Sequence, residues 1–295
     1  MQKFQFQEPK FINGLSAVYN NYDGFIIDLW GVLHDGTSAY PKALEMLKNL
    51  KNSGKKITLL SNAPRRSFMA KKNLDRLGFT EDLYDFLITS GEITFEFVKQ
   101  NNLGKNYFYI GPDKDRDILE GLNVTEVSNA NEAEFALATG FEGFGSVFEE
   151  KKNQVDEALK AGLKLLCANP DFKVVKQTGE EQICSGLIAK YYEENGGRVI
   201  YFGKPYISAY QKCFELMNIN LELNSKIKNK VLCIGDSIHT DILGANNCNS
   251  SGLFVAGGIH KQDFVEDGYL NLTKMADLCN VHHAQPTYII KEFFW

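Results

Sequence analysis

Short apolar runs recur along the chain, separated by stretches in which apolar residues return every three or four positions. The runs are continuously apolar, which is typical of strands that are buried on both faces. We expect strands over residues 25–28, 55–62, 85–92, 230–237 and 251–258. Such strands alternating with helices indicate an α/β fold with a doubly wound, Rossmann-like parallel sheet.

The stretches between these runs have the period of amphipathic helices. Leu44, Leu47 and Leu50 fall on one face of the first predicted helix. Pro64 opens a second predicted helix, which ends at Gly78. A third is predicted to start at residue 207, and its apolar face is formed by Ile207, Tyr210, Phe214 and Met217.

The segment between the third and fourth predicted strands repeats the same pattern. It contains a helical stretch over residues 150–161 and the apolar runs NYFYIG, AEFALATG and LKLLCANPD. Because these elements lie between strands of the first unit, we interpret them as an inserted domain. The predicted organisation is a core domain formed by residues 1–91 and 183–295, with a smaller inserted α/β cap domain at 92–182.

The composition narrows the class of protein. The formal net charge is -5, which argues against a surface that binds nucleic acid or anionic membranes. The start of the sequence does not resemble a secretion signal, and no apolar run approaches the roughly 20 residues that cross a bilayer. The six cysteines form no C-x-x-C pair, so we expect buried free thiols in a reducing compartment. We therefore expect a cytoplasmic protein whose partners include neither nucleic acid nor membrane.

Three of the predicted strands end in polar residues. Asp28 follows FII, and Asp236 follows VLCIG. Ser61 and Asn62 follow ITLL. Asp is also a common turn residue, so one such strand end carries little weight. Because ligands of open parallel sheets bind at the carboxyl ends of the strands, the three together predict one ligand site.

Two further segments add charged groups to this predicted site. Lys204 in FGKPY precedes a helix start, where the helix dipole favours an anion, so it is either a solvated lysine or one that holds an anion. Asp236 and Asp241 in GDSIHTDILGA could cap a helix. Facing Asp28, however, these carboxylates would repel one another without a cation between them. Mg²⁺ suits this arrangement because it takes one or two carboxylates and bridges to phosphate oxygens.

Phosphoryl transfer to a carboxylate accounts for all of these groups. We expect Asp28 to attack phosphorus and form an aspartyl phosphate, while Mg²⁺ offsets the repulsion between the nucleophile and an anionic substrate. Ser61, backbone N–H groups and Lys204 are expected to hold the phosphoryl oxygens until water releases phosphate. The expected substrate is a small phosphorylated molecule.

The same residues resemble the ordered motifs of the haloacid dehalogenase (HAD) superfamily. The motif residues are Asp28 in DLWGVLHDG, Ser61 in LLSNAPR, Lys204 in GKP, and Asp236 with Asp241 in GDSIHTDI. The insertion after the third strand, together with TSGE, ANPD and GKP, resembles the NagD-like class IIA branch. This resemblance covers nearly the whole chain from about residue 22. It implies a large α/β cap and, as in many members of the branch, phosphatase activity on small phosphorylated metabolites.

The resemblance also implies a set of metal ligands. Asp28, the backbone carbonyl of Trp30 and Asp236 would bind Mg²⁺, with Asp241 as a nearby supporting carboxylate. Ser61 and Lys204 would contact the phosphate.

Trp30 departs from the family pattern. Phosphatases of this superfamily usually have D-x-D, in which the second Asp donates a proton to the leaving group, whereas this chain has D-x-W. A positioned general acid typically accelerates the reaction by about 10²–10⁴-fold. Without it, we expect weak turnover or a restriction to substrates with good leaving groups. His34 or Asp35 would substitute only if the loop brings them to the leaving oxygen. Trp30 itself is expected to pack or to line the substrate pocket, with Gly31 and Asn62 as further substrate-binding positions.

Two other functions stay open. A catalytically impaired binding or regulatory protein on the HAD scaffold fits the missing acid, although the other motif residues are retained. A haloacid dehalogenase fits an aromatic residue two positions after the nucleophile, but the carboxylates of Asp236 and Asp241 would oppose an acidic substrate. Metal-dependent turnover that is lost in Asp28→Asn would indicate a phosphatase, and halide release without metal would indicate a dehalogenase.

The aromatic tail YIIKEFFW is expected to pack on the core. The open alternative is an exposed association patch, which would make the protein a homo-oligomer.

Overall fold

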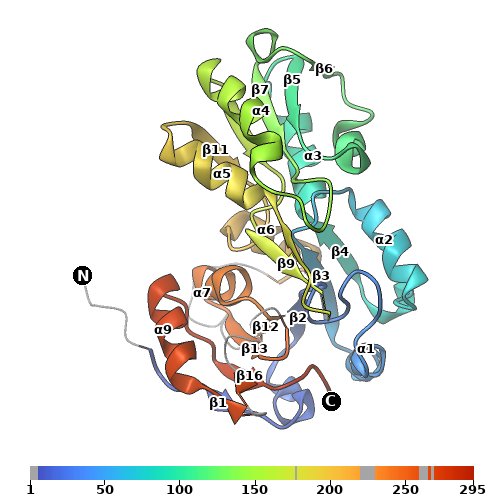
Figure 1. The fold of residues 1–295 in the computed structure, drawn as a ribbon. Coiled ribbons are helices and arrows are strands. Elements are labelled where there is room, and N and C mark those ends of the chain that lie inside the picture. The colour runs from blue at the N-terminus through green and yellow to red at the C-terminus, as the bar shows by residue number, and fades with distance from the viewer. Residues whose placement is uncertain (1–5, 177, 220–229, 259–264, 267–268) are drawn as a thin grey trace. The chain divides into compact units, whose positions relative to one another are not determined.

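The structure is a computed structural model, and it describes residues 6–176, 178–219, 230–258, 265–266 and 269–295. The chain forms two compact units (Figure 1). The first, called the core unit here, comprises Met1–Ser61, Lys72–Ile88 and Lys204–Trp295. The second, called the inserted unit, comprises Asn62–Lys71 and Thr89–Gly203.

A seven-stranded sheet forms the centre of the core unit, in the order β1-β16-β13-β12-β2-β3-β4. Its strands are β1 (Lys10–Phe11), β2 (Gly24–Ile27), β3 (Lys56–Ser61), β4 (Phe86–Thr89), β12 (Val231–Gly235), β13 (Ser251–Val255) and β16 (Tyr288–Ile290). Strand β2 pairs in parallel with both β3 and β12. The strand order therefore reverses beside β2, which is where ligands bind in doubly wound folds.

Helices cover both faces of this sheet. They are α1 (Ala43–Asn52), α2 (Ser67–Arg76), α6 (Ile207–Leu216), α7 (Leu243–Asn247) and α9 (Leu272–His282). Successive residues of a strand point to opposite faces, and the neighbours Leu253 and Phe254 belong to two different buried clusters. Met46 and Leu50 of α1 pack in the first cluster, and Met275 of α9 packs in the second. The expected doubly wound α/β core is thus confirmed.

Three sequence expectations in these elements were wrong. Pro64 does not open the second helix, because α2 starts three residues later, at Ser67. Ile207 does not share the buried face of α6, and 48% of it is exposed. It is the first residue of that helix, so its side chain extends past the helix end instead of onto the sheet. The strand expected over 85–92 ends at Thr89, and α3 (Ser90–Gln100) starts at the next residue. The Thr89 side chain caps this helix by accepting a hydrogen bond from the Glu92 N–H at 3.1 Å.

The inserted unit has its own parallel sheet, in the order β11-β8-β7-β5-β6. The strands are β5 (Asn106–Ile110), β6 (Thr125–Val127), β7 (Phe135–Ala138), β8 (Lys164–Cys167) and β11 (Arg198–Tyr201). Helices α4 (Glu149–Lys160) and α5 (Ser185–Glu194) pack against Ala136 and Ala138, whereas α3 packs with Phe135 and Leu137 on the other face. The inserted unit also contains a short antiparallel pair of strands, β9 (Lys173–Val175) and β10 (Glu181–Ile183).

The inserted unit extends beyond residue 182 because α5 packs on its sheet and β11 pairs with β8. The domain limits expected from the sequence stay a prediction.

Short 3₁₀ turns complete the two units: η1 (Leu15–Ala17), η2 (Tyr19–Asn21), η3 (Glu81–Leu83), η4 (Asp113–Leu119) and η5 (Ala130–Glu132). The core unit also contains the antiparallel pair β14 (Val265–Glu266) and β15 (Tyr269–Leu270).

The tail of the chain packs on the core unit, as expected. Phe293 is buried in the cluster that includes α1, and Phe294 and Trp295 pack against the same cluster. The Trp295 ring also contacts the ring of Tyr19, with centroids 4.6 Å apart. All six cysteines are buried and free, which confirms the expected state of the thiols, while the compartment stays a prediction. In the part of the chain that the structure describes, no helix combines the length and apolar character needed to cross a membrane.

Candidate active site

The strand register brings the predicted site residues of the core unit to one edge of its sheet. Ile27 pairs with Leu59 on one side and with Ile234 on the other. Asp28, Ser61 and Asp236 therefore lie within one residue of the same level, at the carboxyl ends of three adjacent strands. The backbone N–H of Asp28 also donates to the Ile234 carbonyl at 2.9 Å.

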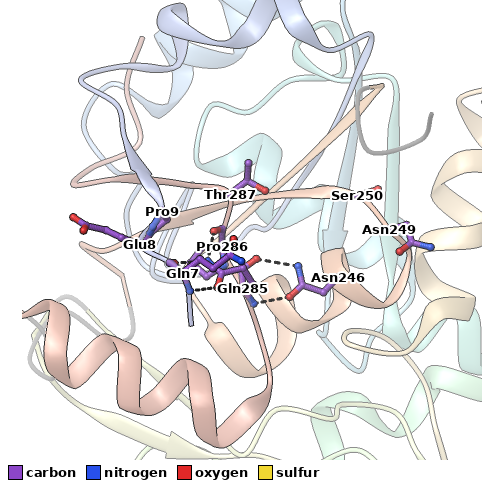
Figure 2. A pocket seen from close by; sticks show the side chains of 9 residues that line it. All are labelled: Gln7, Glu8, Pro9, Asn246, Asn249, Ser250, Gln285, Pro286 and Thr287. Carbon is purple, nitrogen blue, oxygen red and sulfur yellow. Dashed lines mark hydrogen bonds between the residues drawn. The ribbon is translucent and has the colours of Figure 1, made fainter. Parts of the chain in front are cut away.

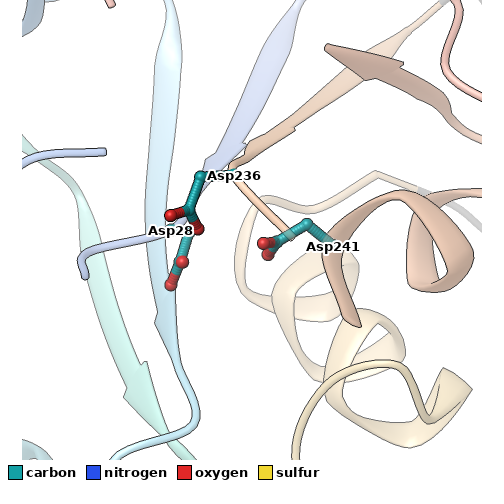
Figure 3. Close-up of side chains that lie close together, drawn as sticks. All are labelled: Asp28, Asp236 and Asp241. Carbon is teal, nitrogen blue, oxygen red and sulfur yellow. The ribbon is translucent and has the colours of Figure 1, made fainter. Parts of the chain in front are cut away.

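Three carboxylates converge at this edge. Asp28, Asp236 and Asp241 are buried, and each offers an oxygen within 4.8 Å of the others (Figure 3). Asp241 reaches the other two from η7 (Ile238–Ile242), a π-helical turn that follows β12. The Ser237 N–H donates to Asp241 Oδ2 at 3.1 Å, which closes this turn around the carboxylate. Such π-helical insertions occur often at functional sites.

Lys204 supplies positive charge to this cluster. Its Nζ lies 2.5 Å from Asp28 Oδ1 and 2.8 Å from Asp241 Oδ1, and only 3% of the residue is exposed. The solvated lysine that the sequence left open is thus excluded, because this ammonium is buried between two carboxylates.

The cluster carries more negative than positive charge, so a further cation would stabilise it. Burial raises the pKa of the Asp28 carboxyl well above its usual value; the Lys204 ammonium opposes this rise, and the charges on Asp241 and Asp236 add to it. One ammonium thus faces three carboxylates at a site of low dielectric constant. The oxygens of Asp28, Asp236 and Asp241 are hard ligands of the type that Mg²⁺ takes. The residues present therefore fit a magnesium ion.

Two glycines leave space for the Asp236 carboxylate. A Cβ added to Gly31 would lie 1.8 Å from Asp236 Oδ2, and one added to Gly258 would lie 2.1 Å from the same atom. Gly31 also has a φ of +84°, which residues with side chains rarely adopt. The substrate-binding role expected for Gly31 stays a prediction, and the structure adds a packing role beside Asp236.

The loop after Asp28 folds back on itself. The backbones of Trp30 and His34 form a β-bridge, and the Gly31 N–H donates to the His34 carbonyl at 2.9 Å. The Trp30 ring is half-buried and meets the His34 ring edge-on, with centroids 6.1 Å apart. A Cβ at Gly36 would lie 2.4 Å from the Trp30 ring, so the ring covers that glycine. Trp30 thus packs on its own loop, one of the two roles expected for it.

His34 and Asp35, the two possible substitutes for the missing acid, differ in their surroundings. The His34 ring is nearly buried, and burial lowers its pKa to about 4. Its Nδ1 accepts a hydrogen bond from the Gly36 N–H at 2.9 Å. Asp35 Oδ1 accepts from the backbone N–H groups of Thr37 and Ser38, at 3.0 and 2.8 Å, and so holds the turn that follows. Asp35 is therefore engaged within the loop.

Asn62 and Ser61 are neighbours in sequence, but Asn62 belongs to the inserted unit. Ser61 is the last residue of β3 and is half-buried. The Asn62 side-chain amide donates to Asp171 Oδ1 at 2.8 Å, within the inserted unit. The substrate-binding role expected for Asn62 stays a prediction.

Tyr40 was not identified from the sequence as a residue near the site. Burial raises the pKa of its phenol most strongly, and the charges of Asp236, Asp35 and Asp28 raise it further. The phenol therefore lies in the electric field of the carboxylates. No sequence pattern marks this position, because Tyr40 reaches the site only through the returning loop, in which its N–H donates to the Leu33 carbonyl at 2.8 Å. Gly258 was missed as well, although the glycine pair GG at 257–258, shortly after β13, was a usable signal.

The core unit has a pocket whose lining residues include none of those described above. It is a pocket of about 370 Å³ lined by Gln7, Glu8, Pro9, Asn246, Asn249, Ser250, Gln285, Pro286 and Thr287 (Figure 2). Gln285 and Asn246 are paired in both directions, through Gln285 N–H to Asn246 Oδ1 at 2.6 Å and Asn246 Nδ2 to the Gln285 carbonyl at 3.0 Å. Gln285 also bonds Gln7 in both directions. These amides hold the pocket wall together.

Two segments of the chain match known protein families. Residues 25–125 match the family described as haloacid dehalogenase-like hydrolase, and residues 201–292 match a family described as HAD-hydrolase-like. Together the two matches include the segments that carry Asp28, Ser61, Lys204, Asp236 and Asp241.

Curated relatives and a solved structure are similar over most of the chain. The sugar-phosphatase AraL of Bacillus subtilis (strain 168) is 25% identical over 264 residues, covering 86% of this chain and 93% of that protein. The ribonucleotide monophosphatase NagD of Escherichia coli (strain K12) is 24% identical over 247 residues, covering 82% and 90%. A crystal structure of a haloacid dehalogenase-like family hydrolase from Brucella suis 1330 superposes with a TM-score of 0.80 at 26% identity, covering 96% of this chain and all of that chain.

Proposed function

Since this chain belongs to the haloacid dehalogenase-like hydrolases, we propose that it is a magnesium-dependent phosphatase with Asp28 as its nucleophile. It acts on small phosphorylated molecules and works best on those with good leaving groups. Curated relatives named as a sugar phosphatase and a ribonucleotide monophosphatase support this activity.

The observation that carries the proposal is the buried cluster of Asp28, Asp236, Asp241 and Lys204. Burying three carboxylates costs a great deal of free energy unless charge and hydrogen bonds compensate it. Lys204 neutralises only part of the negative charge, so this cluster does not stabilise the folded chain. It suits a site that takes up a cation together with an anionic substrate.

The reaction proceeds in two displacements. A carboxylate oxygen of Asp28 forms a bond to phosphorus as the bond from phosphorus to the leaving oxygen breaks, which gives an aspartyl phosphate. Water then attacks phosphorus, inorganic phosphate leaves and the Asp28 carboxylate is restored. The net reaction consumes one water and yields inorganic phosphate and the released group, which is an alcohol, a phenol or, from an acyl phosphate, a carboxylic acid. Lys204, next to Asp28, holds the phosphoryl oxygens in both steps, and Ser61 at the end of β3 is proposed to assist it.

Magnesium would be held by Asp28, Asp236 and the Trp30 carbonyl, with Asp241 beside them. When bound, it supplies positive charge that reduces the repulsion between the nucleophile and the phosphate. Lys204 is placed to share this task, because its ammonium already contacts Asp28 and Asp241.

Trp30 limits the range of substrates. It stands where phosphatases of the superfamily usually carry the acid, and its indole ring packs on Gly36 and beside His34. Alkoxide leaving groups need a proton in the transition state, whereas acyl phosphates and aryl phosphates leave with little help. The enzyme is therefore expected to favour the latter.

The test is phosphate release with Mg²⁺ from acetyl phosphate, p-nitrophenyl phosphate and a set of sugar and nucleotide monophosphates. Asp28→Asn should lower kcat by at least about 10³-fold, because the nucleophile is lost. Asp23→Asn is the matched control, since Asp23 is an exposed residue just before the opposite end of β2 and should keep wild-type rates.

Equal rates in wild type and Asp28→Asn would contradict the proposal. If neither protein releases phosphate from any compound, a binding protein on this scaffold becomes the better interpretation. Release of halide from a haloacid without added metal would instead favour a dehalogenase.

A further inference from the structure

We propose that Asp171 is a positioning residue that holds the Asn62 side chain and, through it, the adjoining residue Ser61. This role rests on the proposed phosphatase function, in which Ser61 and Lys204 hold the phosphoryl oxygens. Asp171 ends the run ANPD, and the two displacements described above give it no task. It touches no substrate and acts only through Asn62.

The contact between Asp171 and Asn62 is short and partly buried. Nδ2 of the Asn62 side chain donates a hydrogen bond to Asp171 Oδ1 at 2.8 Å, and both residues belong to the inserted unit. Asn62 keeps only 3% of its surface exposed. A buried donor that loses its acceptor costs the free energy of its desolvation. The Asp171 carboxylate therefore determines where the Asn62 amide lies.

Hydrogen bonds hold the backbone around Asp171. Its N–H donates to Asn169 Oδ1 at 3.0 Å, and its carbonyl accepts from the Gly186 N–H at 3.1 Å. The Ser185 hydroxyl donates to the Asn169 carbonyl at 2.9 Å. Gly186 lies in the first turn of α5, and a Cβ added there would lie 2.5 Å from the Asp171 carbonyl oxygen. Asp171 is thus fixed against the start of α5 before any substrate binds.

The Asp171 carboxylate also fixes the orientation of the Asn62 amide. An ionised carboxylate only accepts hydrogen bonds, so Nδ2 faces Asp171 and Oδ1 faces the other way. A Cβ added to Gly203 would lie 2.4 Å from Asn62 Oδ1, so this oxygen lies against the backbone of Gly203. Gly203 is the residue directly before Lys204. The side chain of the residue after Ser61 therefore packs on the residue before Lys204.

This packing affects the two residues proposed to hold the phosphoryl oxygens. One peptide bond joins Ser61 to Asn62, and another joins Lys204 to Gly203. By fixing Asn62, Asp171 limits the movement of both backbones. Groups that are fixed in place stabilise the charge of a transition state without reorganising during the reaction. Loss of Asp171 should therefore weaken the hold on phosphate in both displacements, whatever the leaving group is.

The experiment reverses the hydrogen bond and so separates this role from simple anchoring of residues 62–71 in the inserted unit. Asn62→Asp places two carboxylates against each other. Adding Asp171→Asn restores a pair in which residue 171 donates and residue 62 accepts. Asp171→Leu removes the acceptor at similar size, whereas Asp171→Asn alone keeps an acceptor oxygen. For each variant, kcat and KM for p-nitrophenyl phosphate and acetyl phosphate and the Ki of inorganic phosphate are measured with Mg²⁺.

Asp171→Leu and Asn62→Asp should each lower kcat/KM about tenfold or more and raise the Ki of phosphate, because the phosphoryl oxygens are held less firmly. The loss should be the same factor for both substrates, since the leaving group is not involved. Asp171→Asn alone should keep most of the wild-type activity, and adding it to Asn62→Asp should recover most of what that change loses.

Two results would overturn the inference. One is a double variant that is no more active than Asn62→Asp. The other is an Asp171→Leu protein whose kcat/KM and Ki match the wild type, because the hydrogen bond then serves only as an anchor. Thermal melting shows whether each variant folds. If Asp171→Leu does not fold, the comparison of Asn62→Asp with the double variant decides.

A control variant and the Asp28 requirement separate the possible failures. Asp117→Leu changes an exposed aspartate of the same unit and should keep wild-type rates. Failure of the proposed function would appear as the absence of any Asp28-dependent phosphate release from the wild type. Failure of this inference alone would appear as Asp28-dependent release that does not respond to Asp171.

Discussion

At the scale of single residues, the site depends on glycines, which have no side chain, as much as on charged residues. The Asp236 carboxylate lies against the backbones of Gly31 and Gly258, where no side chain fits. The position of an oxygen that we propose binds the metal is thus set by two glycines from different segments of the chain. Substitutions at these glycines should affect chemistry more than stability.

We expect Gly31→Ala to reduce phosphate release by at least about 100-fold, since the new methyl group would displace Asp236 Oδ2 and with it the metal. The backbone at residue 31 has a φ of +84°, which is unfavourable for alanine. The substitution should therefore also lower the free energy of unfolding by about 1–2 kcal/mol. Initial rates and chemical denaturation measure the two effects.

Gly54→Ala is the matched control. Gly54 has a similar φ of +71°, but no atom lies within 4 Å of an added Cβ. It should show the loss of stability without the loss of activity. Similar activity in the two variants would show that Asp236 adapts to the methyl group.

At the scale of elements, Glu92 ties α3 to the start of α2. Its carboxylate accepts two parallel hydrogen bonds from the Arg66 guanidinium, both at 2.9 Å, and a third from the Ser67 N–H at 2.9 Å. The Arg66 guanidinium also lies 3.4 Å from the centroid of the Phe95 ring. One side chain thus satisfies an N–H in the first turn of α2 and orients the segment that follows Ser61.

Glu92→Gln should lower the free energy of unfolding by about 1–2 kcal/mol, because the bidentate, partly buried ion pair is lost. The change is measured by thermal or urea unfolding. Glu194→Gln is the control: Glu194 contacts Lys190 at 3.9 Å on the exposed side of α5, and its loss should change stability by less than about 0.5 kcal/mol. Equal effects of the two changes would refute a special role for Glu92.

The sequence predicted the elements that hold the carboxylates, but not the loop between them. Strands β2, β3 and β12 are short and mostly apolar, so the apolar runs alone located Asp28, Ser61 and Asp236 at their ends. The family relationship inferred from those residues is confirmed. The return of the loop that brings His34 to Trp30 depends on backbone hydrogen bonds and a ring contact. These have no periodic signature in the sequence.

Other elements were missed for similar reasons. The helix start at Ser90 was hidden by the apolar run before it, although Thr89 and Glu92 have the spacing of a capping box. Strand β11 is only partly buried, and its assignment to the inserted unit depends on pairing with β8, a contact over a long sequence distance.

At the scale of the whole molecule, the site couples ligand binding to stability. Three carboxylates repel one another in the core unit, and a bound cation relieves this repulsion. Binding to the folded chain alone stabilises it by mass action, by about 2.7 kcal/mol when the ion is at 100 times its dissociation constant.

Added Mg²⁺ should therefore raise the melting temperature of the wild type, as measured by differential scanning calorimetry without substrate. Asp236→Asn should lose this rise and, without metal, should be at least as stable as the wild type because one repelling charge is removed. Asp23→Asn should keep the rise. If Mg²⁺ leaves the wild type unchanged, or stabilises Asp236→Asn equally, the cluster is not the magnesium site.

The position of β2 between β3 and β12 also has a consequence for synthesis on the ribosome. β3 is translated soon after β2, but β12 follows only after the whole inserted unit has been made. At roughly 5–20 residues per second, the nascent chain carries an apolar strand edge without its partner for on the order of ten seconds. Throughout that interval Asp28 has no Asp236 beside it. The nascent protein therefore passes through a stage in which it is vulnerable to aggregation and its candidate active site is incomplete.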